Sequence, residues 1–278
     1  MALDALVSTG WLAENLGQHG LTVIDLRAPA DGGRASFEAG HIPGAIFSDY
    51  AADGWRKRVG NVPGLLPEAA HLSTLFAQLG VTPESHVVLI PTGSGANDLA
   101  ASARAFWTLK IAGHPAVSIL DGGTKRWQAE ERALETGPDA PRAAALYPVS
   151  FQPGWRMLAA DVLANLGQRT LIDARSASYY AGAEKAAEAK RAGHIPGAHS
   201  LDYARLFDPA TGALKSRAEL EALFASIPAG PTTVYCNTGH TAALDWFALR
   251  MILNRPETLL YDGSMTEWTQ DEARPVEV

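Results

Sequence analysis

The chain has 278 residues, enough for one large domain or two of ordinary size; 47% of them are hydrophobic and 19% are charged. This composition excludes a disordered tail and allows a sizeable buried core. The net charge of −7 argues against a general nucleic-acid binder or a protein that binds anionic membranes.

The first 20 residues contain neither a basic segment nor a long apolar run, so they do not predict a secretory signal. No later stretch reaches the roughly 18 apolar residues that a membrane span needs. From these two observations we expect a soluble, cytoplasmic protein.

The first half of the chain alternates apolar strands with helical segments, which is typical of a parallel α/β domain. The expected strands are Thr22–Leu26, Val87–Ile90 and Val117–Leu120, and the expected helices are Glu68–Leu79 and Leu99–Ala112. The strands are apolar throughout rather than alternating with polar residues, which favours a sheet covered on both faces.

Residues 136–154 contain four prolines and no amphipathic period, so we interpret them as a linker between domains. The strand and helix alternation resumes after this segment. The expected strands are Thr170–Ala174, Thr232–Tyr235 and Thr258–Tyr261, and the expected helices are Arg217–Ser226 and Thr241–Leu253.

Three motifs occur twice, in the same order, in the two halves of the chain. The sequence Ala-Gly-His-Ile-Pro-Gly-Ala stands at 39–45 and again at 192–198. Ile-Asp-x-Arg precedes it at 24–27 and 172–175, and an Asp-Gly motif ending in Trp follows at 121–127 and 262–268. The spacing differs modestly, as loop insertions would cause. The repeat predicts two homologous domains, at 1–135 and 155–278, each a mainly parallel sheet flanked by helices.

The repeated Pro-Gly pair has a local structural explanation. Proline followed by glycine suits the two central positions of a type II turn, where glycine supplies the positive φ. The conformation of the turn therefore accounts for most of this motif in both copies.

The chain has one cysteine, Cys236, which cannot form an intrachain disulfide or a multi-cysteine metal site. It directly follows the expected strand Thr232–Tyr235 and opens a short loop, Asn237, Thr238, Gly239, His240 and Thr241, before a helix. In an open α/β sheet, ligands bind at the carboxyl ends of strands, and such loops direct backbone N–H groups at one point. A lone cysteine is often inert and buried. This location favours a reactive thiolate instead.

The two Gly-His-Ile-Pro-Gly-Ala copies, the single cysteine opening a six-residue loop and the Asp-Gly-Ser after the next strand resemble the tandem-domain rhodanese family. The resemblance covers nearly the whole chain. It implies two rhodanese domains, a non-catalytic one at 1–135 and a catalytic one at 155–278. It also implies a sulfurtransferase of the thiosulfate or 3-mercaptopyruvate type whose cysteine carries a persulfide.

The first half has no equivalent nucleophile. Aligning residues 91–93 with 237–239 places Ile90 opposite Cys236, and no thiol or hydroxyl stands there. Its loop at 92–97 is rich in glycine and serine but lacks the Gly-Lys-Ser/Thr of a phosphate-binding loop. We therefore interpret the first domain as a scaffold and as one wall of the site.

The resemblance implies a ping-pong mechanism. Cys236 takes a sulfane sulfur from a small-molecule donor, and the amides of 237–241 stabilise the anionic sulfur. Cyanide, a small thiol or a protein dithiol, such as that of a thioredoxin-like reductant, then accepts it. We expect neither a metal nor an organic cofactor, and neither a nucleic-acid nor a membrane partner.

The sequence leaves the donor open. Family members specialised for thiosulfate carry Arg and Lys after the cysteine, where this chain has the neutral Asn237 and Thr238. The Thr238 hydroxyl slightly favours 3-mercaptopyruvate as the donor, because the mercaptopyruvate group uses a hydroxyl in this loop to aid the leaving enolate. However, Ala187 and Ser178 occupy the positions of the arginines that hold the mercaptopyruvate carboxylate in that group. The nearby cations that could substitute are Lys185, Lys190 and Arg191.

Three histidines lie in or beside the repeated motifs and the cysteine loop. His240 in the loop could favour the thiolate or give a pH dependence, or it could face solvent. His41 is a substrate-binding candidate by the resemblance, with Asp31 as its expected partner. His194, in the matching turn of the second domain, is interpreted as structural.

Two other functions compete with the sulfurtransferase. A cysteine phosphatase needs an arginine six positions after the cysteine to bind the phosphoryl group. Here that position is Ala242, so the phosphatase hypothesis fails on this residue. A persulfide carrier or regulatory sulfur-binding module without efficient turnover stays open as the alternative.

Overall fold

The computed structural model describes residues 4–140 and 144–278. The chain divides into two compact units. Unit 1 comprises the described parts of Met1–Trp55, Pro67–Gln152 and Phe207–Leu214, and unit 2 comprises Arg56–Leu66, Pro153–Leu206 and Lys215–Val278. Each unit therefore includes one short segment from the opposite half of the sequence. The predicted domains, 1–135 and 155–278, are contiguous and do not include this exchange.

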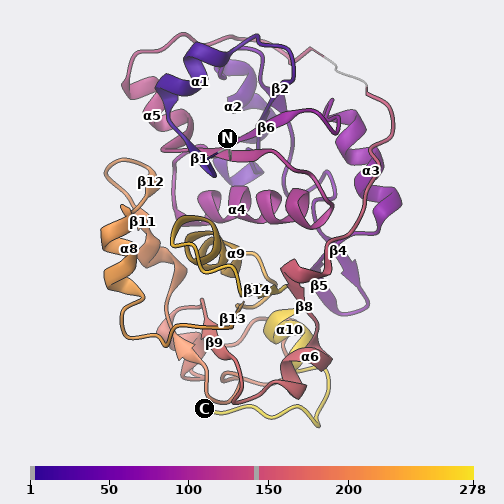
Figure 1. Cartoon of the computed structure of the whole chain (residues 1–278), viewed down its shortest axis with the longest axis vertical. Helices are drawn as coiled ribbons and strands as arrows, with labels where there is room; N and C mark the ends of the chain where they lie inside the picture. Colours follow the sequence, from indigo (N-terminus) through magenta and orange to yellow (C-terminus); the bar gives the residue numbers. More distant parts are fainter. Residues whose placement is uncertain (1–3, 141–143) are drawn as a thin grey trace. The chain divides into compact units, whose positions relative to one another are not determined.

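Unit 1 is built on a five-stranded sheet whose neighbouring strands all pair in parallel. Its order is β1 (Leu6–Val7), β7 (Val117–Leu120), β6 (His86–Ile90), β2 (Leu21–Asp25) and β3 (Ile46–Phe47). Its helices are α1 (Thr9–Asn15), η1 (Pro29–Asp31), α2 (Gly33–Ala39), α3 (Ala69–Gln78), α4 (Ala96–Ile111) and α5 (Gly123–Ala129), and they flank the sheet (Figure 1).

Unit 2 repeats this sheet with the same topology. Its order is β10 (His199–Ser200), β9 (Thr170–Asp173), β13 (Thr232–Tyr235), β14 (Thr258–Tyr261) and β8 (Arg156–Met157), again with parallel pairs throughout. Its helical segments are η2 (Pro153–Trp155), α6 (Ala159–Ala164), α7 (Ala177–Tyr180), η3 (Tyr203–Leu206), α8 (Arg217–Leu223), α9 (Ala242–Phe247), η4 (Ala248–Ile252) and α10 (Ser264–Trp268). The expected fold, two homologous α/β domains, is confirmed.

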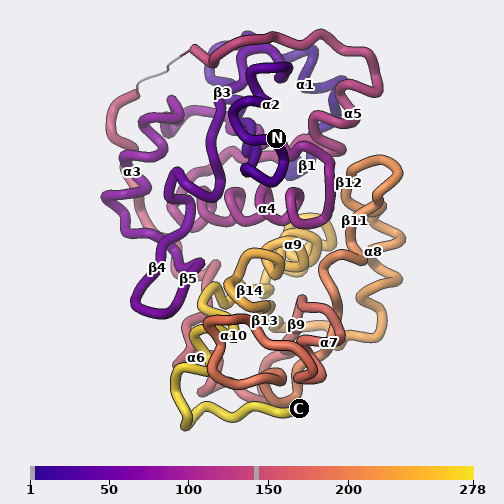
Figure 2. The backbone as a smooth tube through the Cα atoms, turned by 180° about the vertical axis from the view of Figure 1, so that it is seen from behind, coloured from indigo at the N-terminus to yellow at the C-terminus, as the bar shows by residue number. Residues whose placement is uncertain are grey.

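Two hairpins are the segments that change unit. β4 (Lys57–Val59) pairs with β5 (Val62–Leu65), and this hairpin packs against α10 in unit 2. β11 (Phe207–Asp208) pairs with β12 (Ala213–Leu214) in unit 1, where Lys125 donates to the Pro209 carbonyl at 2.8 Å. Both hairpins can be followed in Figure 2.

The repeated Pro-Gly turn has the predicted conformation in both units. Gly44 and Gly197 have φ values of 71° and 74°. The turn closes through an N–H of Ala45 donating to the Ile42 carbonyl at 3.0 Å, and Ala198 repeats this bond at 3.1 Å. The preceding isoleucine is completely buried in each copy, so the turn anchors the chain to the core.

The described part of the predicted linker belongs to unit 1 as far as Gln152. The amide of Tyr147 donates to Ser73 at 3.3 Å in α3, and that of Gln152 donates to Ile111 at 2.7 Å in α4. Residues 141–143 of the predicted linker lie outside the described residues. Within the part of the chain that the structure describes, no helix combines the length and apolar character needed to cross a membrane.

His114, which Tyr147 contacts, should make unit 1 sensitive to acid. The His114 Nδ1 atom lies 2.9 Å from the Tyr147 hydroxyl, and burial lowers the pKa of His114 to about 4. An unfolded histidine binds its proton near pH 6.5, so stability should fall by up to about 3 kcal/mol between pH 6.5 and 4. We expect His114→Gln to flatten this decline in urea unfolding measured across that range. The exposed His19→Gln is the control and should keep it.

Candidate active site

Cys236 lies at the carboxyl end of β13, the central strand of the unit 2 sheet. Its neighbours β9 and β14 pair with β13 on either side. The side chain is only 2% exposed, and the Cys236 loop, residues 236–241, leads directly into α9. Figure 1 shows α9 running beside β13 and β14. The structure thus places the thiol where parallel sheets bind their ligands.

The backbone of Cys236 is held by the start of α10. The Cys236 N–H donates to the Ser264 hydroxyl at 3.0 Å, and that hydroxyl donates to the Tyr261 carbonyl at 2.8 Å. The Cys236 carbonyl in turn accepts from Met265 N–H at 3.0 Å. Ser264 has a φ of 50°, a left-handed conformation that is uncommon outside glycine, so this hydroxyl is set in place at a conformational cost.

The structure corrects the predicted equivalence of Ile90 and Cys236. In unit 1 the Thr124 N–H donates to the Pro91 carbonyl at 3.0 Å, which is the bond that Met265 makes to Cys236. Ile90 pairs with the last residue of β2 as Tyr235 pairs with the last residue of β9. Pro91 therefore stands opposite Cys236. The sequence alignment was one residue out because the two loops differ in length, and proline is not a nucleophile either.

A buried ion pair supports the Cys236 loop from the end of β9. Arg175 bonds Asp173 through two nitrogens, at 2.8 and 2.6 Å, and both side chains are almost completely buried. Another Arg175 nitrogen lies 3.4 Å from the Asn237 side-chain oxygen. Although burial opposes the charge, hydrogen bonding and attraction from Asp173, with smaller contributions from Tyr235 and Cys236, raise the pKa of Arg175. A permanent positive charge therefore lies beneath the loop.

Asp245 is a buried carboxyl in α9 that belongs to none of the sequence motifs. Its side chain is completely buried, and neither oxygen has a hydrogen-bond partner among the described residues. Burial, and then the negative charges of Cys236, Asp202 and Asp173, raise the pKa of Asp245 well above its usual value. The carboxyl consequently keeps its proton at pH values where an ordinary aspartate has lost it.

The raised pKa of Asp245 predicts the direction in which stability changes with pH. A carboxyl whose pKa is raised by folding favours the folded state at acidic pH and loses that contribution as the pH rises above the unfolded value near 3.9. Asp245→Asn cannot ionise, so its stability relative to the wild type should increase from pH 4 towards pH 9. Chemical unfolding at several pH values measures this difference. A constant difference would show that folding does not raise the pKa of Asp245.

His41 makes the same kinds of contact in unit 1 as His194 makes in unit 2. His41 Nδ1 lies 2.9 Å from the Phe37 carbonyl, and its ring stacks on Phe37 at 3.8 Å. His194 repeats both contacts with Tyr180, at 2.9 and 3.8 Å. Each histidine thus fixes the helix before its turn. The role of His41 in substrate binding stays a prediction.

Asp31 is not the partner of His41. Its carboxylate accepts from the Ser94 hydroxyl at 2.6 Å, in the glycine-rich loop of unit 1, whereas His41 Nε2 faces Glu135 at 3.8 Å. The expected Asp31–His41 pair is therefore wrong. It failed because η1 directs Asp31 towards the loop after β6, which spacing along the chain does not reveal.

The other predicted residues all lie in unit 2. His240 is partly exposed in the Cys236 loop. Lys185 donates to the Ala189 carbonyl at 2.6 Å, and Arg191 donates to the Asp271 carbonyl at 2.8 Å, while the side chain of Lys190 is exposed. Two of the three predicted cations thus bind backbone carbonyls, and substrate binding by any of them stays a prediction.

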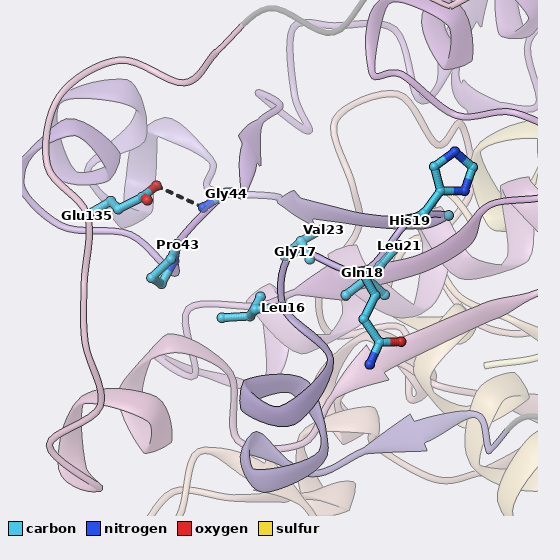
Figure 3. A pocket seen from close by; sticks show the side chains of 10 residues that line it. Leu16, Gly17, Gln18, His19, Leu21, Val23, Pro43, Gly44 and Glu135 are labelled. Atoms are coloured by element: carbon cyan, nitrogen blue, oxygen red, sulfur yellow. Dashed lines mark hydrogen bonds between the residues drawn. The ribbon is translucent and has the colours of Figure 1, made fainter.

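A separate pocket of about 490 Å³ lies in unit 1. Figure 3 shows it between the turn after α1 and the Pro-Gly turn, with Glu135 accepting from the Gly44 N–H at 2.8 Å. Its lining residues are Leu16, Gly17, Gln18, His19, Gly20, Leu21, Val23, Pro43, Gly44 and Glu135. This set offers no nucleophilic thiol or hydroxyl, so the pocket is not a candidate for the chemistry expected of Cys236.

Comparison with known proteins matches both halves to one family model, the Rhodanese-like domain, over residues 8–130 and 158–271. A thiosulfate sulfurtransferase of Corynebacterium glutamicum is 33% identical over 99% of this chain and 90% of its own length. A 3-mercaptopyruvate sulfurtransferase of Escherichia coli is 32% identical over 100% of this chain and 99% of its own.

Solved structures agree with these sequence matches. The crystal structure of SseA from Escherichia coli, described as a 3-mercaptopyruvate sulfurtransferase with the rhodanese fold, shares 29% identity and a TM-score of 0.77. The match covers 95% of this chain and 100% of that one. Tum1 from Saccharomyces cerevisiae, at 24% identity and a TM-score of 0.81, has the same fold.

Proposed function

The chain belongs to the rhodanese-like family, with two copies of the domain, and is a sulfurtransferase; from this premise we propose that it transfers a sulfane sulfur through a persulfide on Cys236. The observation that supports this most directly is the position of Cys236. It is the one thiol of the chain, it directly follows β13, the central strand of unit 2, and its backbone N–H is held by Ser264.

The first half-reaction loads the cysteine. The Cys236 thiolate attacks the outer sulfur of the donor, a sulfur–sulfur bond forms, and the bond between that sulfur and the rest of the donor breaks. Its electron pair leaves with sulfite when thiosulfate is the donor, or with the enolate of pyruvate when 3-mercaptopyruvate is the donor. The amides of residues 237–241 in the Cys236 loop stabilise the negative charge on the sulfur, as an oxyanion hole stabilises oxygen.

The second half-reaction regenerates the enzyme. Cyanide or a thiolate attacks the outer sulfur of the persulfide, and Cys236 leaves as the thiolate. Arg175 lies beneath the loop in both half-reactions and attracts the charge on Cys236. The proposed acceptors are cyanide and small or protein thiols, including a thioredoxin-like dithiol.

The loop favours a donor with a single negative charge beside the sulfur. Asn237 and Thr238 are neutral, and Arg175 is already paired with Asp173. Thiosulfate is a dianion and gains less from this loop than a monoanionic donor does. We expect kcat/KM for 3-mercaptopyruvate to exceed that for thiosulfate, with cyanide as the common acceptor.

Steady-state kinetics tests the proposal. Initial rates with varied donor and acceptor should give the parallel reciprocal lines of a ping-pong reaction. Intersecting lines would contradict a persulfide that forms before the acceptor binds. The alternative is a sulfur carrier, which the 2% exposure of Cys236 also suits, since a buried persulfide is protected from solvent. A single stoichiometric loading without turnover by any acceptor would favour the carrier.

A further inference from the structure

The hairpin β4–β5 comes from the first repeat but belongs to unit 2. β5 packs against α10, the helix whose first residue, Ser264, holds Cys236. Figures 1 and 2 both show the hairpin beside the part of unit 2 that contains α10. The hairpin is therefore a neighbour of the Cys236 loop although it is far from it in the sequence.

The end of the hairpin is attached through Asp262. The Leu66 N–H donates to Asp262 Oδ2 at 2.8 Å, and Arg156 donates to Asp262 Oδ1, also at 2.8 Å. Asp262 is only 1% exposed and stands two residues before Ser264. In the Asp-Gly-Ser motif, the aspartate thus binds the hairpin while the serine binds the backbone of Cys236.

A second contact joins the hairpin directly to the loop. Gly64 is buried, with a φ of +84°, and a Cβ atom built on it would lie 2.4 Å from the Thr238 carbonyl oxygen and 2.8 Å from the Thr238 Cβ. Both distances are shorter than any side chain tolerates. The backbone of the hairpin therefore rests on the Cys236 loop, at a spacing that only glycine permits.

This contact fixes the orientation of one peptide of the loop. The peptide group is planar and trans, so its C=O and N–H point in opposite directions. The Thr238 carbonyl faces the hairpin, and the N–H of Gly239 in the same peptide must point away from the hairpin. A displacement of Thr238 would redirect the Gly239 N–H together with it.

We propose that strand β5 of this hairpin supports the active site through Gly64, which is a positioning residue for the Thr238–Gly239 peptide. This inference rests on the proposed function, in which the amides of the Cys236 loop stabilise the anionic sulfur. It assigns to the first repeat a direct contribution to the reactivity of Cys236. Gly64 acts through the loop and does not itself contact the reacting atoms.

Gly64→Ala and Gly60→Ala form a matched pair for the test. Both glycines lie in the hairpin with positive φ, so alanine adds backbone strain at either position, but a Cβ at Gly60 meets nothing within 4 Å. Because the chain has one cysteine, alkylation by iodoacetamide reports on Cys236 alone. The pH midpoint of alkylation reports thiolate stabilisation, and the plateau rate at high pH reports access.

We expect Gly64→Ala to raise the pH midpoint of alkylation and to lower kcat by about a hundredfold, the usual cost of a misplacement of about 1 Å. Gly60→Ala should match the wild type in both measurements. The double variant Gly64→Ala, Thr238→Gly lacks the Thr238 Cβ, one of the two atoms that the new side chain would crowd, and its loop backbone is freer to move. Its pH midpoint of alkylation should therefore lie between those of Gly64→Ala and the wild type. A wild-type midpoint in Gly64→Ala would overturn the proposal.

Hydrogen exchange on the wild-type protein provides a second test if Gly64→Ala does not fold. Alkylation of Cys236 should change amide protection in residues 57–65 but not in the β11–β12 hairpin of unit 1. Unchanged exchange in residues 57–65 would contradict the contact. If the wild type accepts sulfur from no donor, the proposed function fails, whereas the alkylation midpoints still decide whether Gly64 positions the loop.

Discussion

Cys236→Ser is expected to lose sulfur transfer by about a thousandfold or more, because a serine hydroxyl stays protonated near neutral pH and cannot form a persulfide. The fold should be unaffected. The bonds that hold this position to Ser264 and Met265 use the backbone of residue 236, not its side chain. Steady-state rates with each donor and cyanide measure the loss.

The control for this variant is its stability. Cys236→Ser and the wild type should unfold at closely similar urea concentrations, so that lost activity is not lost structure. Substantial turnover by the folded variant would mean that another residue carries the sulfur. His240 and Thr238 share the loop with Cys236 but have no thiol with which to do so.

Asp173→Asn is expected to destabilise unit 2 by about 3–5 kcal/mol, because it leaves the buried Arg175 charge without its carboxylate. It should also slow sulfur transfer beyond the effect on stability. Arg175 reaches Asn237 in the Cys236 loop, and a guanidinium without its partner no longer holds one orientation there. Urea unfolding measures the first effect, and kcat of the folded fraction measures the second.

The first repeat contains a matched control in Asp25→Asn. Asp25 and Arg27 form the same buried pair at the end of β2, with an N–O distance of 3.1 Å. We expect a similar loss of stability from Asp25→Asn without a change in the alkylation midpoint of Cys236. Equal effects of the two variants on that midpoint would show that Arg175 has no special relation to the loop.

The two repeats differ in a coordinated way at Cys236 and Ser264 and at the matching positions of unit 1. Where unit 2 has the Cys236 N–H and the Ser264 hydroxyl, unit 1 has Pro91, which lacks an N–H, and Gly123, which lacks a side chain. Gly123 keeps the positive φ of Ser264, at 56°, and a Cβ there would lie 2.1 Å from the Pro91 carbonyl oxygen. The N–H donor and the hydroxyl acceptor are absent together, so neither of these two positions in unit 1 leaves a partner unsatisfied.

Local patterns were sufficient to predict the central strands and the position of Cys236. Thr232–Tyr235 consists of β-branched and aromatic residues and is preceded by turn residues, and the structure has β13 at the same residues. The helix expected at Thr241–Leu253 is present but divides into α9 and the π-helical turn η4, a change of hydrogen-bond register that the apolar pattern did not indicate. The short edge strands β1 and β8 have two residues each and carry no detectable period.

The supports of the site could not be predicted, because they depend on contacts between distant segments. Asp262 and Ser264 stood in a visible motif, but nothing in the sequence indicated that they bind Leu66 and Cys236. Nothing in the sequence indicated a role for Gly64, because that role depends on how closely its backbone approaches Thr238. Asp245 falls on an otherwise apolar helix, an exception to the pattern that could have identified it.

The intact mass of the protein after incubation with a donor tests the central claim most directly. With 3-mercaptopyruvate or thiosulfate, the wild type should gain the mass of one sulfur atom. After digestion, the peptide that contains Cys236 should carry this added mass. Cyanide should remove it, and Cys236→Ser should never acquire it. A wild-type protein that gains no sulfur from either donor, or gains it at another residue, would contradict sulfur transfer through Cys236.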